Sequence, residues 1–295
     1  MNAIHGSERA TAGVRPERPP VLVRVILVTV GALLVWLLMG WVDDTLFPAE
    51  EVTTASHVVN ALLVFVLAVP LVWAARRFLD RRPWGGLGLT GVREGRRPFL
   101  VGAAAWALPG AAGIALCVAM GWASVTAAVP WTELLPGVLS LAALVLVFEA
   151  VPEELIFRGY LYRNLNAAMP AWLAVLAQAA LFALFGTGLW VILNGWGVLA
   201  ERLALFLGMG IVLGGIRLVT GNLWACVGFH LVFQTVAQTM LSSGYVEVRG
   251  VDAIMSTGFL APFVFGVPTV MLLSLTTGDW GRRVPDPIAR EGCPS

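Results

Sequence analysis

Long apolar runs, separated by short polar stretches, dominate the 295-residue chain. A run of 18 or more apolar residues is long enough for an α-helix to cross a bilayer. The pattern predicts eight such helices, at residues 21–42, 57–75, 98–121, 134–157, 171–193, 198–219, 222–241 and 254–276. The sequence therefore predicts an all-α polytopic membrane helix bundle, with one transmembrane domain at residues 21–276.

The arginines outside the apolar runs alternate between the two sides that eight spans would create. Four lie in the N-terminal stretch up to Arg24, seven lie between the second and third spans, and none lies between the third and fourth. Because basic residues concentrate in cytoplasmic segments, we expect both termini to be cytoplasmic, with a disordered tail at residues 1–20 and a second tail at 277–295. No cleavage site follows the first span, so we expect an uncleaved, multi-pass protein of the cell membrane.

Composition supports this picture and excludes some functions. Hydrophobic residues make up 58% of the chain and charged residues 13%, whereas soluble domains have about 25% charged residues. The net charge of +1 and the lack of a basic patch outside short loops argue against a nucleic-acid partner. Cys117, Cys226 and Cys293 are far apart and predict neither a disulfide framework nor a cysteine–metal site.

A group of charged residues ends the fourth predicted span, in the stretch VFEAVPEELIFRGYLYRN. An unpaired charge in hydrocarbon costs about 2.5–3.5 kcal/mol, so this group must be paired, solvated or near the interface. Glu154 and Arg158 are four residues apart with the acid first, the favourable order for an ion pair. Glu153 lies about 100° around the helix from Glu154, which leaves it free for acid–base work, and Glu149 shares its face. The alternative is that these residues mark the cytoplasmic end of the span.

A second polar pair, His230 and Gln234, follows in the stretch FLGMGIVLGGIRLVTGNLWACVGFHLVFQ. His230 is eight residues past Asn222, or about 12 Å along an α-helix. This offset brings it toward the depth of Glu153 on a helix that runs the other way. Ionisable groups inside a membrane are functional by default, and the alternative is a histidine that is hydrogen-bonded within the bundle.

With these motifs in this order, residues 131–241 resemble the CPBP intramembrane proteases, the family of type II CAAX prenyl endopeptidases and bacteriocin-processing, Abi-like relatives. The family's E-E-x-x-x-R motif matches Glu153, Glu154 and Arg158, and its H-x-x-x-N motif matches His230 with Gln234 in place of asparagine. The resemblance implies an intramembrane endopeptidase that acts on a prenylated or hydrophobic peptide. It implies Glu153 as general base, Glu154 and Arg158 as its orienting pair, and His230 with Gln234 at the oxyanion or at a metal.

The family's F-x-x-x-H motif is incomplete here, because Phe182 is followed four residues later by Gly186. No histidine lies between His57 and His230, and the predicted topology puts His57 in the outer half of the membrane. The loss would weaken a peptidase, since an acid–base partner typically contributes about 10²–10⁴-fold. It would also leave fewer ligands than zinc ordinarily has. Thr187 or a water molecule is a candidate substitute.

Three functions remain open: a weakened peptidase, a non-catalytic binding, immunity or regulatory relative, and an enzyme that acts on a free isoprenoid diphosphate. In the third, acidic residues would bind Mg²⁺ while Arg158 holds the diphosphate. The cofactor is thus open between Zn²⁺, Mg²⁺ and none, and the candidate ligands are Glu149, Glu153, Glu154 and His230. The candidate substrate-binding residues are Glu149, Phe182 and Phe185. The expected partners are the lipid bilayer and either a hydrophobic or prenylated peptide or an isoprenoid.

Overall fold

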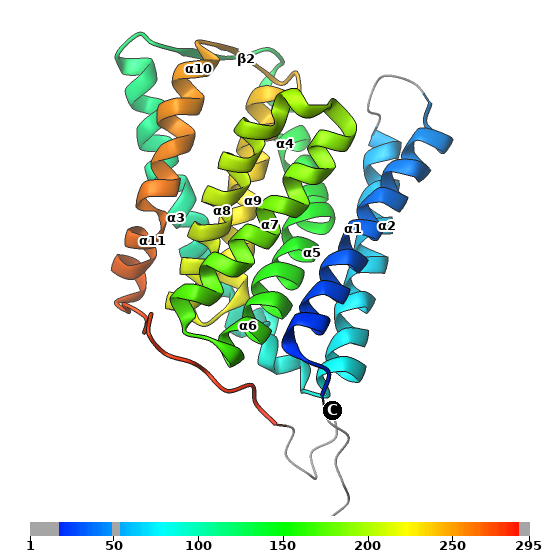
Figure 1. Ribbon diagram of the computed structural model, residues 1–295. Coiled ribbons are helices and arrows are strands. Elements are labelled where there is room, and N and C mark those ends of the chain that lie inside the picture. The colour runs from blue at the N-terminus through cyan, green and yellow to red at the C-terminus, as the bar shows by residue number, and fades with distance from the viewer. Residues whose placement is uncertain (1–17, 49–53, 289–295) are drawn as a thin grey trace, which may run out of the picture.

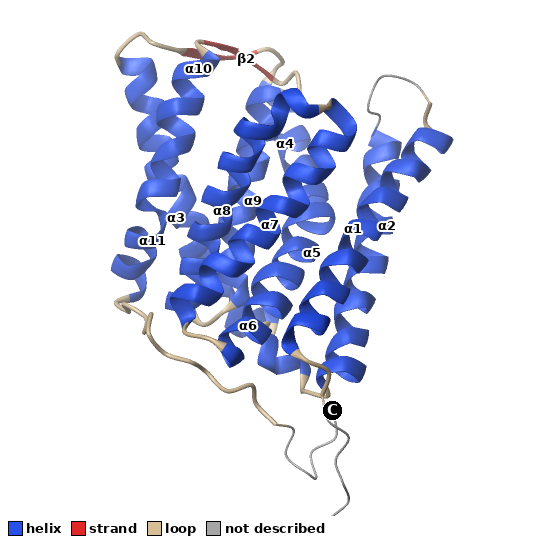
Figure 2. Ribbon diagram, viewed as in Figure 1, coloured by secondary structure: helices blue, strands red, loops and turns tan. Residues whose placement is uncertain are grey.

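Long helices that stand side by side make up the bundle (Figure 1). A computed structural model of the chain describes residues 18–48 and 54–288. The α-helices in these residues are α1 (Val21–Leu46), α2 (Thr54–Ala74), α3 (Val92–Ala119), α4 (Trp131–Val145), α5 (Val151–Glu154), α6 (Tyr162–Ala168), α7 (Ala171–Asn194), α8 (Leu199–Thr220), α9 (Leu223–Leu241), α10 (Val251–Ala253) and α11 (Leu260–Ser274). Two strands, β1 (Ser124–Ala127) and β2 (Val246–Arg249), pair antiparallel at one end of the bundle (Figure 2). The all-α prediction is confirmed, with this small sheet as an unpredicted addition.

Short turns of other helix types extend and join several α-helices. The π-helical turns are Ala75–Asp80, Leu146–Ala150, Leu155–Leu161 and Ile254–Phe259, and the 3₁₀ turns are Trp84–Leu87 and Trp196–Val198. Through the second and third π-helical turns, α4, α5 and α6 form one continuous rod, Trp131–Ala168, which we call the α4–α6 rod. Because π-helical turns are rare and frequent at functional sites, the two that flank α5 draw attention to the glutamates on it.

Seven helical segments within the described residues are long and apolar enough to cross a membrane. The remaining predicted span corresponds to α9, which has 19 residues but carries His230, Gln234 and Gln238 among its apolar side chains. The predicted multi-pass bundle is thus confirmed. Which end faces the cytoplasm stays a prediction, and residues 1–17 and 289–295 of the two predicted tails lie outside the described residues.

Several predicted span boundaries differ from the observed helix ends, two of them by six residues or more. The fourth span was expected to end at residue 157, but the α4–α6 rod continues to Ala168, so Arg158 and Arg163 are buried helix residues. The third was expected to begin at residue 98, but α3 begins at Val92. Hydropathy marks where apolar sequence ends, whereas a helix continues wherever its polar side chains find partners or water.

The T-G-N stretch determines where α9 begins. Gly221 has a φ of 64°, a left-handed conformation that suits glycine, and ends α8. Asn222 then caps α9, because its side chain accepts a hydrogen bond of 2.9 Å from the Trp224 N–H. The Leu223 N–H donates to the Gly88 carbonyl at 2.9 Å, which anchors the start of the helix. Together these contacts set the depth at which the later residues of α9 lie.

Two glycines bring α9 against α3. A Cβ atom on Gly102 would lie 1.8 Å from the Ala225 carbonyl oxygen, and one on Gly228 would lie 2.1 Å from the Phe99 carbonyl oxygen. Membrane helices commonly associate through such small residues, because lipid provides no hydrophobic driving force between them. This contact fixes which face of α9 turns toward the α4–α6 rod.

At one end of the bundle, two buried aspartates bind arginines from distant segments. Both described ends of the chain lie there (Figure 1), so we call it the terminal end. Asp80 accepts hydrogen bonds from Arg24 and Arg76, each at 2.8 Å. Asp286 accepts two from Arg76, at 2.8 and 2.7 Å, and one from Arg163 at 3.3 Å. These ion pairs join α1, the π-helical turn Ala75–Asp80 after α2, and the α4–α6 rod to the segment that follows α11.

We expect the terminal end to be cytoplasmic, with residues 76–97 and 277–295 on that side and residues 43–56 and 244–252 outside. In a Cys293→Ser background, a cysteine at Arg93 should be labelled from the cytoplasmic side and one at Asp252 from the outside. Cys117 and Cys226 are buried and should not react. If the Arg93→Cys variant were labelled only from the outside, the orientation would be the reverse of the predicted one.

We expect Asp286→Asn to lower the thermal stability of the protein. Burial raises the pKa of Asp286, but hydrogen bonds and charges from Arg76, together with Arg163 and Arg18, outweigh it and hold the pKa below its usual value. This stabilisation is therefore present above the unfolded pKa of about 3.9 and is lost as the pH falls through the folded value. Removal of one partner of a buried ion pair typically costs about 3–5 kcal/mol, so the Tm at pH 7 should fall by roughly 5–10 °C.

The matched control is Asp44→Asn, which neutralises an exposed acid on α1 and should leave the Tm within about 2 °C. The difference between the wild type and Asp286→Asn should begin to narrow below about pH 4, where the unfolded aspartate takes up a proton, and should disappear as the pH falls through the lower pKa of the native aspartate. Equal melting of the two proteins at pH 7 would contradict the expected role of Asp286.

Candidate active site

Glu154 lies at the centre of the polar residues and is fully buried. Its Oε1 atom accepts a hydrogen bond from Arg158 Nη1 at 3.1 Å and lies 2.8 Å from His230 Nδ1. Because an ionised carboxylate can only accept, this contact assigns the proton to Nδ1. The ion pair expected from the four-residue spacing is thus formed, and the same carboxylate orients the imidazole ring from α9.

The side chain of Arg158 is enclosed by protein. It has no exposed surface, its Nη2 atom donates to the Met209 carbonyl at 3.4 Å, and its guanidinium carbon lies 4.3 Å from the centre of the Phe182 ring. Contacts of this kind stabilise a cation that has lost its water. The guanidinium therefore acts as the partner of Glu154, and it would have to leave that carboxylate to bind a diphosphate.

Glu153 is the neighbouring carboxylate that stays outside the ion pair. Its Oε2 atom lies 4.0 Å from His230 Nε2, and no hydrogen bond joins it to another residue in the described part of the chain. Its side chain is 14% exposed, whereas that of Glu154 is 0% exposed. A separation of 4.0 Å is too long for a hydrogen bond but suits one bridging water. The expected convergence of Glu153 and His230 at one depth is confirmed.

Glu149, one turn before Glu153, borders a small cavity. It accepts a hydrogen bond from Gln238 at 2.9 Å. The cavity holds about 20 Å³, enough for about one water, and His57 also lines it. His57, which was expected in the outer half of the membrane, thus lines the same cavity as Glu149. Its depth in the membrane stays a prediction.

Gly186, where the family motif has histidine, faces an aromatic ring on α8. A Cβ atom on Gly186 would lie 2.8 Å from the Phe206 ring, so this ring occupies the space that a side chain would need. Phe206 in turn packs edge-on against Phe182, with the ring centres 5.5 Å apart. The candidate substitute Thr187 is buried, and its hydroxyl makes no hydrogen bond within residues 18–48 and 54–288. The Phe206 ring therefore occupies the space in which the histidine side chain of the family motif would lie.

The two aromatic candidates for substrate binding belong to the core. Phe182 is 1% exposed and Phe185 is 5% exposed. Both pack against Phe157, with ring centres 4.9 and 5.2 Å apart, and Phe185 also packs edge-on against Trp36 of α1. Contact with a substrate would require the surrounding helices to separate, and this role stays a prediction.

The polar residues do not fit a metal ion as they lie. No group of three histidine, cysteine, aspartate or glutamate side chains in the described residues has the geometry to hold one. Glu154 Oε1 is shared by Arg158 and His230, and Glu149 is bonded to Gln238. The Zn²⁺ or Mg²⁺ site expected from Glu149, Glu153, Glu154 and His230 is therefore not assembled, although these residues lie near one another.

Comparison with known families agrees with the motifs. Residues 135–236 match the family model described as type II CAAX prenyl endopeptidase Rce1-like. Comparisons with curated proteins and with solved structures gave no match. The matched region contains the candidate site residues of both the α4–α6 rod and α9, from Glu149 to Gln234.

We expect Arg158→Ala to destabilise the protein and Glu153→Gln to leave its stability nearly unchanged. The first leaves Glu154 without its cation in a low dielectric, which typically costs about 3–5 kcal/mol, so the Tm in detergent should fall by roughly 10 °C. The second replaces a side chain outside the ion pair by one of the same shape, and the Tm should stay within about 2 °C. Equal losses of Tm would show that the two carboxylates do not have separate roles.

Proposed function

Because residues 135–236 identify the chain as an Rce1-like member of the CPBP family, we propose that it is an intramembrane endopeptidase that cleaves a hydrophobic or prenylated peptide. One observation carries this proposal. Glu154 is held between Arg158 and His230, while Glu153 faces the other nitrogen of the same imidazole at 4.0 Å. A fixed imidazole opposite an unbonded carboxylate is an arrangement suited to activating a water molecule.

In the proposed reaction Glu153 is the general base. A water between Glu153 Oε2 and His230 Nε2 donates one hydrogen bond to each, which leaves an oxygen lone pair for attack on the scissile carbonyl carbon. Glu153 takes one proton as the C–O bond forms. The C–N bond then breaks, and Glu153 returns that proton to the leaving nitrogen. The water oxygen and its second proton end in the new carboxylic acid, which then loses that proton to solvent, and the base is regenerated.

Gln234 is the proposed donor to the oxyanion. It follows His230 by one turn on α9, and its amide differs by one methylene from the asparagine in the family motif. Donors already in place where negative charge develops stabilise the transition state. Glu149 accepts a hydrogen bond from Gln238, one turn after Gln234 on α9, and in this proposal it helps to position the Gln234 amide. In this proposal Glu149 orients a donor and is not a metal ligand.

The absent histidine predicts slow cleavage, since an acid–base partner typically contributes about 10²–10⁴-fold. His230 supplies part of this function, because Glu154 fixes its ring and directs Nε2 toward Glu153. Two alternatives, a non-catalytic binding relative and an enzyme for a free isoprenoid diphosphate, are distinguished by the following tests.

We expect the purified protein in liposomes to cleave a farnesylated fluorogenic peptide, and Glu153→Gln to lower kcat/KM by at least about 100-fold. In a parallel assay the protein is incubated with farnesyl diphosphate and Mg²⁺, and we expect no conversion of the diphosphate. Turnover of the diphosphate would favour the isoprenoid enzyme. Equal peptide binding by the wild type and Glu153→Gln, without cleavage by either, would favour the binding relative.

We expect the double variant Gly186→His, Phe206→Ala to cleave the peptide at least about tenfold faster than Phe206→Ala alone. Shortening Phe206 opens the space in which the new imidazole would lie. Gly186→His alone should lower the Tm, because its Cβ atom would overlap the Phe206 ring. If the double variant and Phe206→Ala cleave at the same rate in folded form, the position of the missing histidine does not limit catalysis.

A further inference from the structure

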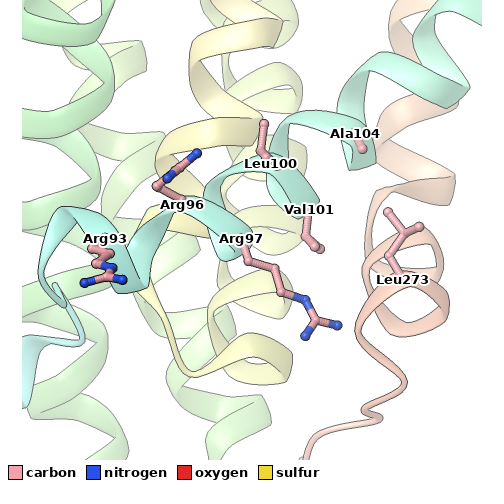
Figure 3. A pocket seen from close by; sticks show the side chains of 7 residues that line it. All are labelled: Arg93, Arg96, Arg97, Leu100, Val101, Ala104 and Leu273. Atoms are coloured by element: carbon pink, nitrogen blue, oxygen red, sulfur yellow. The ribbon is translucent and has the colours of Figure 1, made fainter.

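Three arginines border an open groove of about 570 Å³ at the start of α3 (Figure 3). Arg93, Arg96 and Arg97 lie in the first two turns of this helix and are exposed. None of them has a hydrogen-bond or ion-pair partner among the described residues, and Glu94 in the same turn forms no ion pair with them. The groove lies at the terminal end of the bundle, where unpaired positive charge is concentrated on one helix.

The other half of the groove is apolar. Leu100, Val101 and Ala104 continue along α3, and Leu273 of α11 closes the opposite side. From residue 93 to residue 104 the helix rises about 16 Å, from the terminal end toward the middle of the bundle. The groove therefore changes from cationic to apolar along the direction in which a bilayer changes from headgroup to acyl chain.

The arginines occupy positions that disfavour positive charge. Arg93 lies in the first turn of α3, where the positive end of the helix dipole destabilises cations relative to anions. Three guanidinium groups within five residues also repel one another. An anion bound between them would offset both effects, and the apolar half of the groove indicates that this anion carries a hydrocarbon chain.

We propose that the groove binds one anionic phospholipid of the surrounding bilayer, with its phosphate on Arg93, Arg96 and Arg97 and an acyl chain along Leu100 and Leu273. Basic pockets between transmembrane helices on the cytoplasmic side are known to take anionic headgroups, and the terminal end is the predicted cytoplasmic side. None of the candidate catalytic residues lines the groove, so this inference is independent of the peptidase proposal.

The test is native mass spectrometry of the full-length protein in detergent, titrated with phosphatidylglycerol or with phosphatidylcholine. The wild type should bind one phosphatidylglycerol more tightly than phosphatidylcholine. Arg93→Gln/Arg97→Gln should raise the Kd for phosphatidylglycerol by roughly 30-fold, since each arginine near an anionic lipid contributes about fivefold. Arg77→Gln/Arg282→Gln is the matched control: it removes two exposed arginines elsewhere at the terminal end and should change the Kd less than about twofold.

A second variant tests the apolar half of the groove with the charges intact. Ala104→Trp should fill the groove and weaken phosphatidylglycerol binding several-fold. Val118→Trp, on an exposed apolar position at the far end of α3, should leave binding unchanged. The melting temperature of each variant shows whether it is folded.

Three results would overturn the proposal. Equal effects of the two arginine pairs would indicate general attraction to a basic surface. Unchanged binding in Ala104→Trp would show that the acyl chain does not enter the groove. Displacement of phosphatidylglycerol by millimolar glycerol 3-phosphate, a headgroup without chains, would indicate a site for a free phosphate.

Discussion

One oxygen atom of Glu154 determines the arrangement of the polar centre, by which we mean Glu149, Glu153, Glu154, Arg158 and His230. It accepts from Arg158 within the α4–α6 rod and contacts His230 on α9, so it neutralises a buried cation and joins two helices at once. In a low dielectric, loss of either cation or carboxylate would leave its partner uncompensated, which is far more costly than the pair itself is favourable. The rotation of α9 is fixed independently, by its close approach to α3 at Gly228. The position of the imidazole follows from these two constraints.

The two groups of buried charges in the protein differ in how completely they are satisfied. At the terminal end, Asp80 and Asp286 are each surrounded by arginines, and this network joins distant parts of the chain. In the polar centre, Glu154 Oε1 is paired with Arg158 and His230, although its buried Oε2 has no partner among the described residues. Glu153 has no hydrogen bond among these residues and keeps some exposure. Complete pairing favours stability, and incomplete pairing leaves a group available for proton transfer. This contrast is the physical reason for assigning the chemistry to Glu153.

The sequence predicts the features that depend on local spacing. Apolar runs give the helices, the four-residue interval gives the Glu154–Arg158 pair, and the eight-residue offset after the T-G-N turn gives the depth of His230. Contacts between helices could not be predicted in this way, because they depend on how each helix rotates and slides against its neighbours. Asp286 binds an arginine 210 residues earlier in the chain, and His57 of α2 lines the cavity beside Glu149 of the α4–α6 rod.

The aromatic ring opposite Gly186 explains how the chain lacks the family histidine without leaving a void. An unfilled cavity in packed helices would cost about 24 cal/mol per Å³, and Phe206 removes that cost by occupying the space. Its ring also supports Phe182, which in turn lies against the guanidinium of Arg158. Packing at Gly186 is therefore coupled to the charge pair that orients His230. Phe206 thus supports the residues that position His230 and occupies the space that a second imidazole would need.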